Sequence, residues 1–374
     1  MYASLDAVGY HVPTPIQVRT IAPVLAGRDV VGTAQTGTGK TAAFMIPIVE
    51  RLRTWPSGEA RPSALILCPT REIAEQTHRA AAALGPELRS VVVVGGVGLP
   101  AQVEQLRRQP AIIVATPGRL VDHLDRKTAS LQGVRVLVLD EADRMLDMGF
   151  KPQLARILRS LPQARQTLLF SATLPAEVAK LAASHVRNPV RIEVGQLAAP
   201  PPDAVQDVYL VAGAEKTPLL LSLIEQNPGT VLVFARTRHR TDRLTRSVRA
   251  AGHAVQRLHA DRSQSQRREA LEGFRAGRYR VLIATDVAAR GIDIVGISRV
   301  VNYDLPQTAE DYVHRIGRTA RAGASGHASS FAAPEERAQL TAIERHIGRA
   351  LRRQAATGSG GRSPVEMSRR RDHH

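Results

Sequence analysis

The sequence predicts an α/β protein with two domains, each a mostly parallel sheet with helices on both faces, joined by a flexible linker. Short apolar runs alternate with longer amphipathic segments along most of the 374 residues, which is typical of strand–helix–strand units. Three consecutive prolines, Pro200 to Pro202, interrupt the alternation and fit neither a helix interior nor a central strand. We therefore place a linker at 198–204, between a first domain at 1–197 and a second at 205–335.

Apolar runs predict the individual strands. In the first domain they lie at Asp29–Gly32, Ala64–Cys68, Ser90–Val94, Ala111–Ala115, Val136–Leu139 and Thr167–Phe170. In the second domain they lie at Val205–Leu210, Thr230–Phe234, Ala254–Leu258, Arg280–Ala284 and Val300–Tyr303. Arg71–Leu84 has a helical pattern that ends at Gly85-Pro86. After Pro334 we expect a short amphipathic helix to about Arg353, within a basic and largely disordered tail at 336–374.

The formal net charge of +17 indicates a polyanionic partner, although a solubilising role is the alternative. Aromatic residues make up only 3% of the chain, so contacts to a phosphate backbone suit it better than base stacking. The single cysteine, Cys68, follows an apolar run and predicts a buried thiol in a reducing cytoplasm. No apolar stretch reaches membrane-spanning length, no signal peptide is evident, and the histidines lack zinc-ligand spacing.

A phosphate-binding loop is predicted after the first apolar run. Residues 34–41 read Ala-Gln-Thr-Gly-Thr-Gly-Lys-Thr, with alanine where the strict motif has glycine. Such a loop presents backbone N–H groups to phosphates, so we expect it to bind a nucleoside triphosphate. Lys40 is the predicted contact to the β- and γ-phosphates, and Thr41 is a predicted Mg²⁺ ligand.

Three carboxylates follow the strand predicted at Val136–Leu139. They belong to Asp140, Glu141 and Asp143, at the strand's carboxyl end, where an open α/β sheet binds its ligand. Asp140 is the predicted Mg²⁺ partner, and Glu141 is the predicted base that activates a water molecule. Together with the phosphate loop, these residues predict a nucleotide hydrolysis site; a solvated acidic turn is the alternative.

Over residues 9–323 the chain resembles a DEAD-box RNA helicase of superfamily 2, with the family's motifs in order. The resemblance implies two RecA-like domains that bind ATP, Mg²⁺ and single-stranded RNA across the interdomain cleft. It assigns the nucleotide-binding role to Tyr10, Gln17, Thr36, Gly37, Thr38, Gly39, Lys40, Thr41, Asp140 and Asp293. It assigns RNA contacts to Pro69, Thr70, Arg71, Gly96, Thr116, Pro117, Gly118, Arg119, Arg236, Thr285, Arg290 and Gly291. It assigns the coupling of hydrolysis to strand separation to Asp143, Ser171, Thr173 and His314.

The segment His314-Arg315-Ile316-Gly317-Arg318 resembles motif VI of the same family. Arg315 and Arg318 are three residues apart and share a face if helical. By resemblance both act as arginine fingers that stabilise charge on the γ-phosphate; a basic RNA-binding face is the alternative.

The chain departs from the family pattern at several positions. Ile73, Ala260 and Ala320 replace the usual leucine, glycine and glycine. The family has an aromatic residue about 17 positions before the Q-motif glutamine, and Gln17 leaves no room for it, so we expect either a late start of the chain or weaker adenine contacts.

Two other functions remain open at this stage: a DNA-directed translocase of superfamily 2, and an ATP-gated RNA clamp or assembly scaffold. The short core and basic tail are similar to bacterial RhlE-type members, which suggests a role in ribosome assembly, RNA decay or cold adaptation, with proteins of ribosome assembly or RNA decay as partners. We expect a monomer and no membrane partner.

Overall fold

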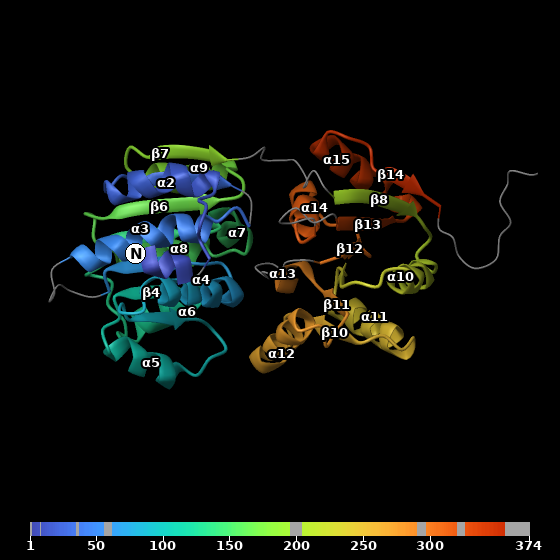
Figure 1. The fold of residues 1–374 in the computed structure, drawn as a ribbon, viewed down its shortest axis with the longest axis horizontal. Helices are drawn as coiled ribbons and strands as arrows, with labels where there is room; N and C mark the ends of the chain where they lie inside the picture. Colours follow the sequence, from blue (N-terminus) through green and yellow to red (C-terminus); the bar gives the residue numbers. More distant parts are fainter. Residues whose placement is uncertain are drawn as a thin grey trace, which may run out of the picture. The chain divides into compact units, whose positions relative to one another are not determined.

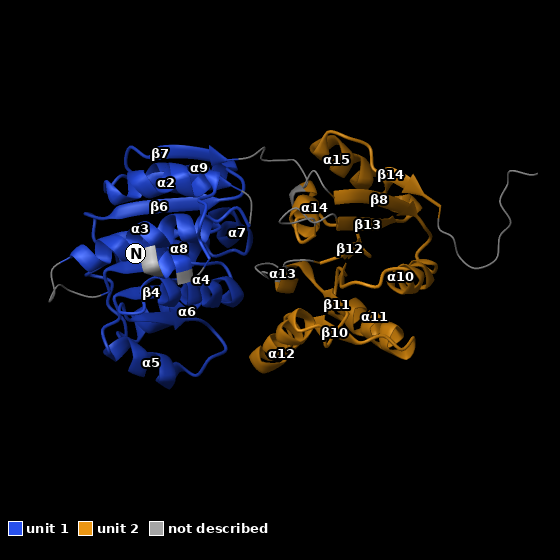
Figure 2. Ribbon diagram, viewed as in Figure 1, with its two compact units in different colours: residues 1–197 blue, residues 198–374 orange. Residues whose placement is uncertain are grey.

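The computed structural model describes residues 2–7, 9–34, 37–55, 62–194, 204–289, 297–319 and 326–355. The chain divides into two compact units, 1–197 and 198–374, shown in different colours in Figure 2. In the described part of the chain, no helix is both long and apolar enough to cross a membrane.

The first unit is a seven-stranded sheet with the order β3-β4-β2-β5-β6-β1-β7, and each described pairing is parallel. Strands β4, β6 and β7 of this sheet are labelled in Figure 1. The strands are β1 (Val30–Ala34), β2 (Ala64–Leu67), β3 (Ser90–Val93), β4 (Ile112–Ala115), β5 (Val136–Leu139), β6 (Gln166–Ser171) and β7 (Val190–Val194). Central parallel strands are buried on both faces, which is why they read as continuous Val, Ile and Leu runs.

Helices cover both faces of this sheet. On one face lie α1 (Tyr2–Ala7), α2 (Pro15–Leu25), α3 (Lys40–Thr54) and α4 (Arg71–Leu84). On the other lie α5 (Leu99–Arg107), α6 (Pro117–Asp125), α7 (Ala142–Asp147), α8 (Lys151–Arg159) and α9 (Ala176–His185). Alternate strand residues divide between the two cores: Ile66 and Val138 pack in the first, Leu65 and Leu137 in the second.

The second unit repeats this plan with the order β10-β11-β9-β12-β13-β8-β14, again with parallel pairings. Its strands are β8 (Ala204–Leu210), β9 (Val231–Phe234), β10 (Val255–Leu258), β11 (Val281–Ala284), β12 (Arg299–Asn302), β13 (Gly326–Ala332) and β14 (Arg352–Gln354). Its helices are α10 (Lys216–Glu225), α11 (Arg238–Ala250), α12 (Gln264–Arg275), α13 (Asp286–Ala289), α14 (Ala309–Ile316), the 3₁₀ turn η1 (Pro334–Glu336) and α15 (Arg337–Ile347). Helices α10 and α11 cover one face, while α12 to α15 cover the other.

The predicted fold class is confirmed, and every predicted strand forms within one or two residues of its expected position. Strands β7, β13 and β14 were not expected. Strand β7 alternates exposed charged residues with the buried Ile192, and β13 buries Ser329 and Ser330, so neither reads as an apolar run. In β14, Arg352 and Arg353 are exposed, and Arg352 binds Asp207 of β8 at 2.6 Å.

The helix expected after Pro334 forms as α15, but residues 336–355 pack as part of the second unit and do not form the largely disordered tail that was predicted. Leu340, Ile343 and Leu351 are buried against β8 and β13, and helix α15 ends at Ile347, well before Arg353. Glu344 holds the returning chain, because it accepts a hydrogen bond from Leu351 N at 2.7 Å and pairs with Arg353 at 2.7 Å. Residues 356–374 and the linker at 198–203 lie outside the described residues.

Truncation after Glu344 should therefore destabilise the second unit, whereas truncation after Ala355 should not. The shorter chain loses β14 and the buried Leu351, which should lower its free energy of unfolding by on the order of 2–4 kcal/mol. Its melting temperature should therefore fall by about 5–10 °C. Far-ultraviolet circular dichroism measures this loss. Trp55, the only tryptophan, lies in the first unit against Arg51 and Arg135, so its fluorescence should report an unchanged first transition. Equal melting of both truncated chains would contradict the assignment of β14.

Candidate functional site

The predicted site residues of the first unit lie at one edge of its sheet. Since the strands are parallel, the loops that follow them open on the same side. Loops after β1, β5 and β6 contain the residues predicted to bind the nucleotide and to couple hydrolysis. Loops after β2, β3 and β4 contain those predicted to contact RNA. The fold therefore places the two sets of predicted residues along a single edge.

The described part of the phosphate loop is held in a left-handed turn. Gly37 and Gly39 have φ angles of 84° and 93°, a region that glycine reaches without strain. A Cβ on Gly39 would lie 2.6 Å from Gln17 Nε2, so this glycine also allows the start of α2 to approach closely. Gln17 Nε2 donates to Gly39 O at 3.3 Å, which joins the predicted adenine-reading residue to the loop. Thr36 lies outside the described residues.

Lys40 begins helix α3 and is buried under the loop. Its Nζ donates to Ala34 O at 2.7 Å, across the residues that form the turn. Thr41 follows it in the first turn of the same helix, where N–H groups have no intrahelical partner and attract anions. Tyr10 precedes helix α2 and is 42% exposed.

Asp140 is a buried carboxylate with an unsatisfied oxygen. The residue is 4% exposed, and Oδ1 has no hydrogen-bond partner among the described residues. Burial, together with the neighbouring Glu141 carboxylate, raises the pKa of Asp140 to about 7, although Lys40 opposes the shift. A buried anionic oxygen without a donor is favourable only when a cation completes it.

Glu141 has a strained backbone. Its φ of 52° and ψ of 55° are left-handed, a conformation that is uncommon for residues other than glycine. Its carboxylate pairs with Arg144 on the first turn of α7. Strain of this kind is typical of functional sites, where the surrounding structure enforces the geometry.

These oxygens fit a magnesium ion. Mg²⁺ takes one or two protein oxygens and completes its shell with water and phosphate oxygens. Asp140 offers the free oxygen and Thr41 a hydroxyl, and the described residues form no larger group of potential metal ligands. A site of this kind suits a metal that arrives with a nucleotide.

Asp143 joins the end of β5 to the end of β6. Its Oδ2 accepts hydrogen bonds from Ala172 N at 3.1 Å, from Thr173 N at 2.9 Å and from Thr173 Oγ1 at 2.9 Å. Its own N–H donates to Ser171 Oγ at 3.2 Å. Three of the four residues predicted to couple hydrolysis to strand separation thus form one hydrogen-bonded network, and neither Ser171 nor Thr173 caps helix α9, whose N-cap residue is Pro175.

The predicted RNA contacts of the first unit gather around the loop after β3. A side chain on Gly96 would overlap the guanidinium of Arg71, and Gly96 has a φ of 73°. Arg119 Nη1 donates to Val97 O at 2.8 Å. The residues at the starts of α4 and α6 are mostly buried and offer backbone rather than side chains: Pro69, Thr70, Thr116 and Pro117, with the half-buried Gly118.

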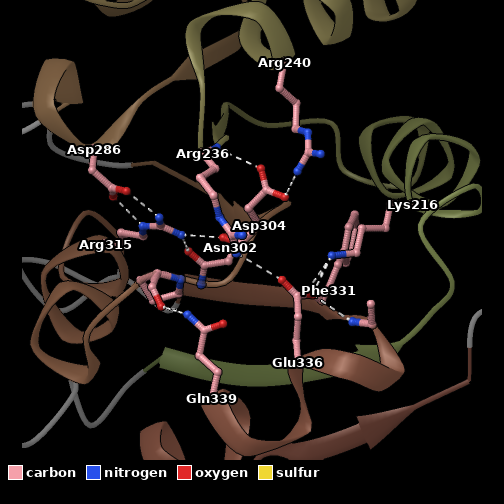
Figure 3. Close-up of polar contacts among 12 residues, drawn as sticks. Lys216, Arg236, Arg240, Asp286, Asn302, Asp304, Arg315, Phe331, Glu336 and Gln339 are labelled. Carbon is pink, nitrogen blue, oxygen red and sulfur yellow. Dashed lines mark hydrogen bonds and ion pairs between the residues drawn. The ribbon is translucent and has the colours of Figure 1, made fainter.

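In the second unit, Arg315 is held by several partners (Figure 3). Its Nε and Nη2 bind the Asp286 carboxylate at 2.6 Å each, and its Nη1 donates to Asn302 Oδ1 at 3.0 Å and to Asp304 O at 2.7 Å. The guanidinium also lies 4.8 Å from the Phe234 ring centre. Arg315 is 3% exposed, and these bonds use four of its five N–H donors within the unit. The assignment of Arg315 as an arginine finger stays a prediction.

Asp304 connects this network to Arg236. Its Oδ2 accepts from Arg236 N at 2.8 Å and its Oδ1 from Arg240, while Arg236 Nη2 donates to Glu336 at 3.2 Å (Figure 3). The segments predicted to touch RNA and nucleotide in this unit are thus linked by a single buried aspartate.

Other predicted residues of this unit are placed less fully. Arg318 follows α14 and is 6% exposed, His314 lies within α14, and Thr285 lies just before α13. Arg290, Gly291 and Asp293 fall outside the described residues.

The sequence analysis missed Asp286, Asn302 and Asp304. The signal was present for the two aspartates, because Asp286 and Asp304 follow the strands β11 and β12 closely, as Asp140 follows β5. Asn302 is the last residue of β12, and nothing in an apolar run marks it as a hydrogen-bonding residue.

The fold and the site define a two-unit nucleoside-triphosphate hydrolase with RecA-like sheets. Residues 14–181 match the family model of the DEAD/DEAH box helicases, and residues 215–323 match that of the helicase conserved C-terminal domain. The chain therefore belongs to the DEAD-box family of ATP-dependent RNA helicases.

Individual relatives agree with this placement. The chain is 43% identical to the DEAD-box ATP-dependent RNA helicase CshA of Bacillus licheniformis, over 94% of this chain and 72% of that protein. The Bacillus subtilis CshA is 42% identical over 94% and 71%. Among solved structures, S. cerevisiae Dbp5 bound to RNA and ADP BeF3 has a TM-score of 0.85 and 34% identity, covering 95% of this chain and 93% of that one. Mss116p bound to ssRNA and AMP-PNP has a TM-score of 0.86 and 28% identity, covering 94% and 76%.

Asp140→Asn should stabilise the first unit without ligand and abolish its response to Mg²⁺ and ATP. The folded pKa near 7 exceeds the usual 3.8, so the carboxylate weakens the fold progressively between about pH 4 and 7 and most strongly above pH 7. An amide avoids this loss, about 1–3 kcal/mol for an unsatisfied buried group. Trp55 fluorescence melts at pH 4.5 and pH 8, with and without Mg²⁺ and ATP, measure both effects. A variant that still gains stability from Mg²⁺ and ATP would contradict the ligand assignment.

Proposed function

We propose that this DEAD-box RNA helicase, an RNA-dependent ATPase, hydrolyses ATP with Mg²⁺ at the edge formed by the ends of β1, β5 and β6. The observation that carries this proposal is the buried, unpartnered oxygen of Asp140 beside Glu141. A cation and a triphosphate supply what these carboxylates lack. The relatives named above support ATP as the nucleotide, because solved neighbours contain ADP BeF3 and AMP-PNP.

Each residue has a defined task in this proposal. The loop N–H groups and Lys40 bind the β- and γ-phosphates, while Thr41 and Asp140 hold Mg²⁺. When bound, Mg²⁺ would offset the negative charge that develops during phosphoryl transfer. Glu141 accepts the proton of the attacking water, and its fixed backbone keeps the carboxylate at the end of β5.

RNA is the proposed polymer. Dbp5 and Mss116p were solved with RNA, and the chain resembles both along most of its length. The predicted contacts are glycines, buried prolines and arginines, which address the sugar–phosphate backbone and carry no direct sequence information. We propose that bound RNA is held in a form incompatible with a duplex, so that short duplexes open locally. Its place in a bacterial cytoplasm remains a prediction.

Coupling between the two ligands passes through Asp143 in the first unit. A change in the γ-phosphate region that moves Glu141 also moves α7, and Asp143 transmits this to the Ser171-Ala172-Thr173 segment. This network lies within one unit. The proposal adds Arg318 of the second unit as the cation that stabilises the transition state.

Glu141→Gln should retain ATP and RNA binding but lose about 10²–10⁴ in kcat, because the amide cannot accept the proton. Steady-state ATP hydrolysis with poly-uridine measures this, and nucleotide affinity from a fluorescent ATP analogue gives the control. Poly-deoxythymidine of the same length should stimulate the wild-type chain far less. Equal stimulation by both polymers would favour a DNA-directed translocase, and near-normal kcat in the variant would exclude Glu141 as the base.

Arg315→Ala and Arg318→Ala should fail in different ways. Removing Arg315 leaves Asp286 and Asn302 without their partner, so the second unit should lose about 3–5 kcal/mol of stability. Removing Arg318, which is 6% exposed, should lower kcat on the order of 10³-fold in assays run below the melting temperature. Circular dichroism melts and ATPase rates separate the two effects. A stable Arg315→Ala protein without ATPase activity would identify Arg315 as the finger.

A further inference from the structure

A buried polar chain supports the loop after β3, and the activity described above does not account for it. Gln102 lies on α5 and is 2% exposed, and His123 lies on α6 and is fully buried. Packing alone would favour apolar residues at both positions. Amide and imidazole groups are stable there only because they are hydrogen-bonded.

Gln102 binds both ends of the loop. Its Nε2 donates to Val94 O at 2.9 Å and to Val97 O at 3.3 Å, the carbonyls on either side of Gly95 and Gly96. Both amide hydrogens are therefore used on the loop. Its Oε1 is 3.4 Å from His123 Nε2.

His123 fixes which way the amide faces. Since Gln102 Oε1 can only accept, His123 Nε2 must be the protonated nitrogen, and Nδ1 then accepts from the Thr128 hydroxyl at 2.8 Å. The single hydrogen of this hydroxyl is shared with His123 O, which lies 3.1 Å from the hydroxyl oxygen. Burial, with the nearby Arg119, lowers the pKa of His123, so the ring is neutral as this arrangement requires. A flipped Gln102 would place its oxygen against two carbonyl oxygens. The hydrogen bonds from Thr128 through His123 and Gln102 to the loop therefore have one arrangement of donors and acceptors.

This support determines where the loop N–H groups point. In a trans peptide the C=O and the following N–H are antiparallel. Because Val94 O is turned toward Gln102, the N–H of Gly95 is directed away from α5. Within the described residues, neither Gly95 N–H nor Gly96 N–H donates to a protein group. Successive free N–H groups of this kind form an anion-binding concavity.

Two arginines that are predicted to contact RNA lie against the same loop. Arg119 donates to Val97 O, the carbonyl that Gln102 also binds, and Arg71 lies against Gly96. Gly95 and Gly96 have no side chains with which to restrict the backbone, so the loop conformation depends on groups outside it.

We propose that Gln102, oriented by His123 and Thr128, is the positioning residue that holds the Gly95-Gly96 loop in the form that binds RNA phosphates. This inference rests on the proposed function, since it assumes that RNA binds at this edge. Gln102 does not touch ATP or the reacting water. Its loss should weaken RNA binding while leaving catalysis in the RNA-saturated enzyme unchanged.

Gln102→Leu in the full chain tests the inference. The RNA concentration that gives half-maximal ATPase activity should rise about tenfold, because a loop that lost its hydrogen bonds must be ordered by the RNA itself. The kcat at saturating RNA and the KM for ATP should stay within about twofold of wild type. If Gln102 has only a structural role, Gln102→Leu should lower the melting temperature. The RNA concentration for half-maximal activity, measured well below that temperature, should then stay unchanged.

Gln105→Leu is the matched control. Gln105 lies one turn further along α5, is exposed, and its side chain binds no described residue. The same substitution there should leave the RNA requirement unchanged. If Gln102→Leu does not fold, Thr128→Val decides, because it removes only the hydroxyl that orients His123 from a half-buried site. It should raise the RNA requirement about two- to fourfold.

Arg119→Ala separates this inference from the function on which it rests. If Arg119→Ala raises the RNA requirement but Gln102→Leu and Thr128→Val do not, the positioning role is wrong and the RNA site stands. If Arg119→Ala also has no effect, RNA does not bind at this loop, and both fail. An equal effect of Gln102→Leu and Gln105→Leu overturns the inference as well.

Discussion

The parallel alignment of the strands is the constraint on which the rest of this structure depends. In each unit every described strand pairing is parallel, so residues that follow strands separated by tens of positions in the chain meet at one edge. In the first unit this places Lys40, Asp140 and Ser171 at the same edge, at or after the ends of three different strands. Reversing a single strand would move its loop to the opposite edge and remove its residues from the site. The chemistry is therefore set by topology before any side chain is considered.

The buried aspartates show how the same sequence signal leads to different roles. Asp140, Asp143 and Asp304 all lie close behind buried strands. The Asp143 carboxylate receives three hydrogen bonds on one oxygen, and Asp304 binds two arginines and supports a third. Asp140 alone keeps an oxygen without a donor. In a low-dielectric site, satisfied carboxylates make structure rigid, and the unsatisfied one defines where a cation belongs.

Much of this could be predicted from the sequence, and the limits have physical reasons. Apolar runs located the central strands because parallel strands are buried on both faces. Strand β13 escaped because its buried Ser329 and Ser330 are satisfied by neighbours such as Asn302 and Arg299, a compensation that one strand's sequence does not contain. The same limit applies to Arg315. Its spacing from Arg318 indicated a shared face. Only the fold, however, brings Asp286, which lies 29 residues earlier in the sequence, against the Arg315 guanidinium. Gln102 and His123 look like ordinary polar helix residues until the hydrogen bonds between them are known.

The left-handed backbone of Glu141 has a consequence for engineering this chain. Glycine, or to a lesser degree asparagine, adopts that conformation with less strain, so either replacement relaxes the turn between β5 and α7. A selection that rewards only resistance to heat will thus enrich variants at this position that have lost the glutamate. Thermostability screens of this enzyme need a simultaneous requirement for turnover. At position 141 the residues that adopt this backbone conformation with least strain lack the carboxylate proposed to act as the base.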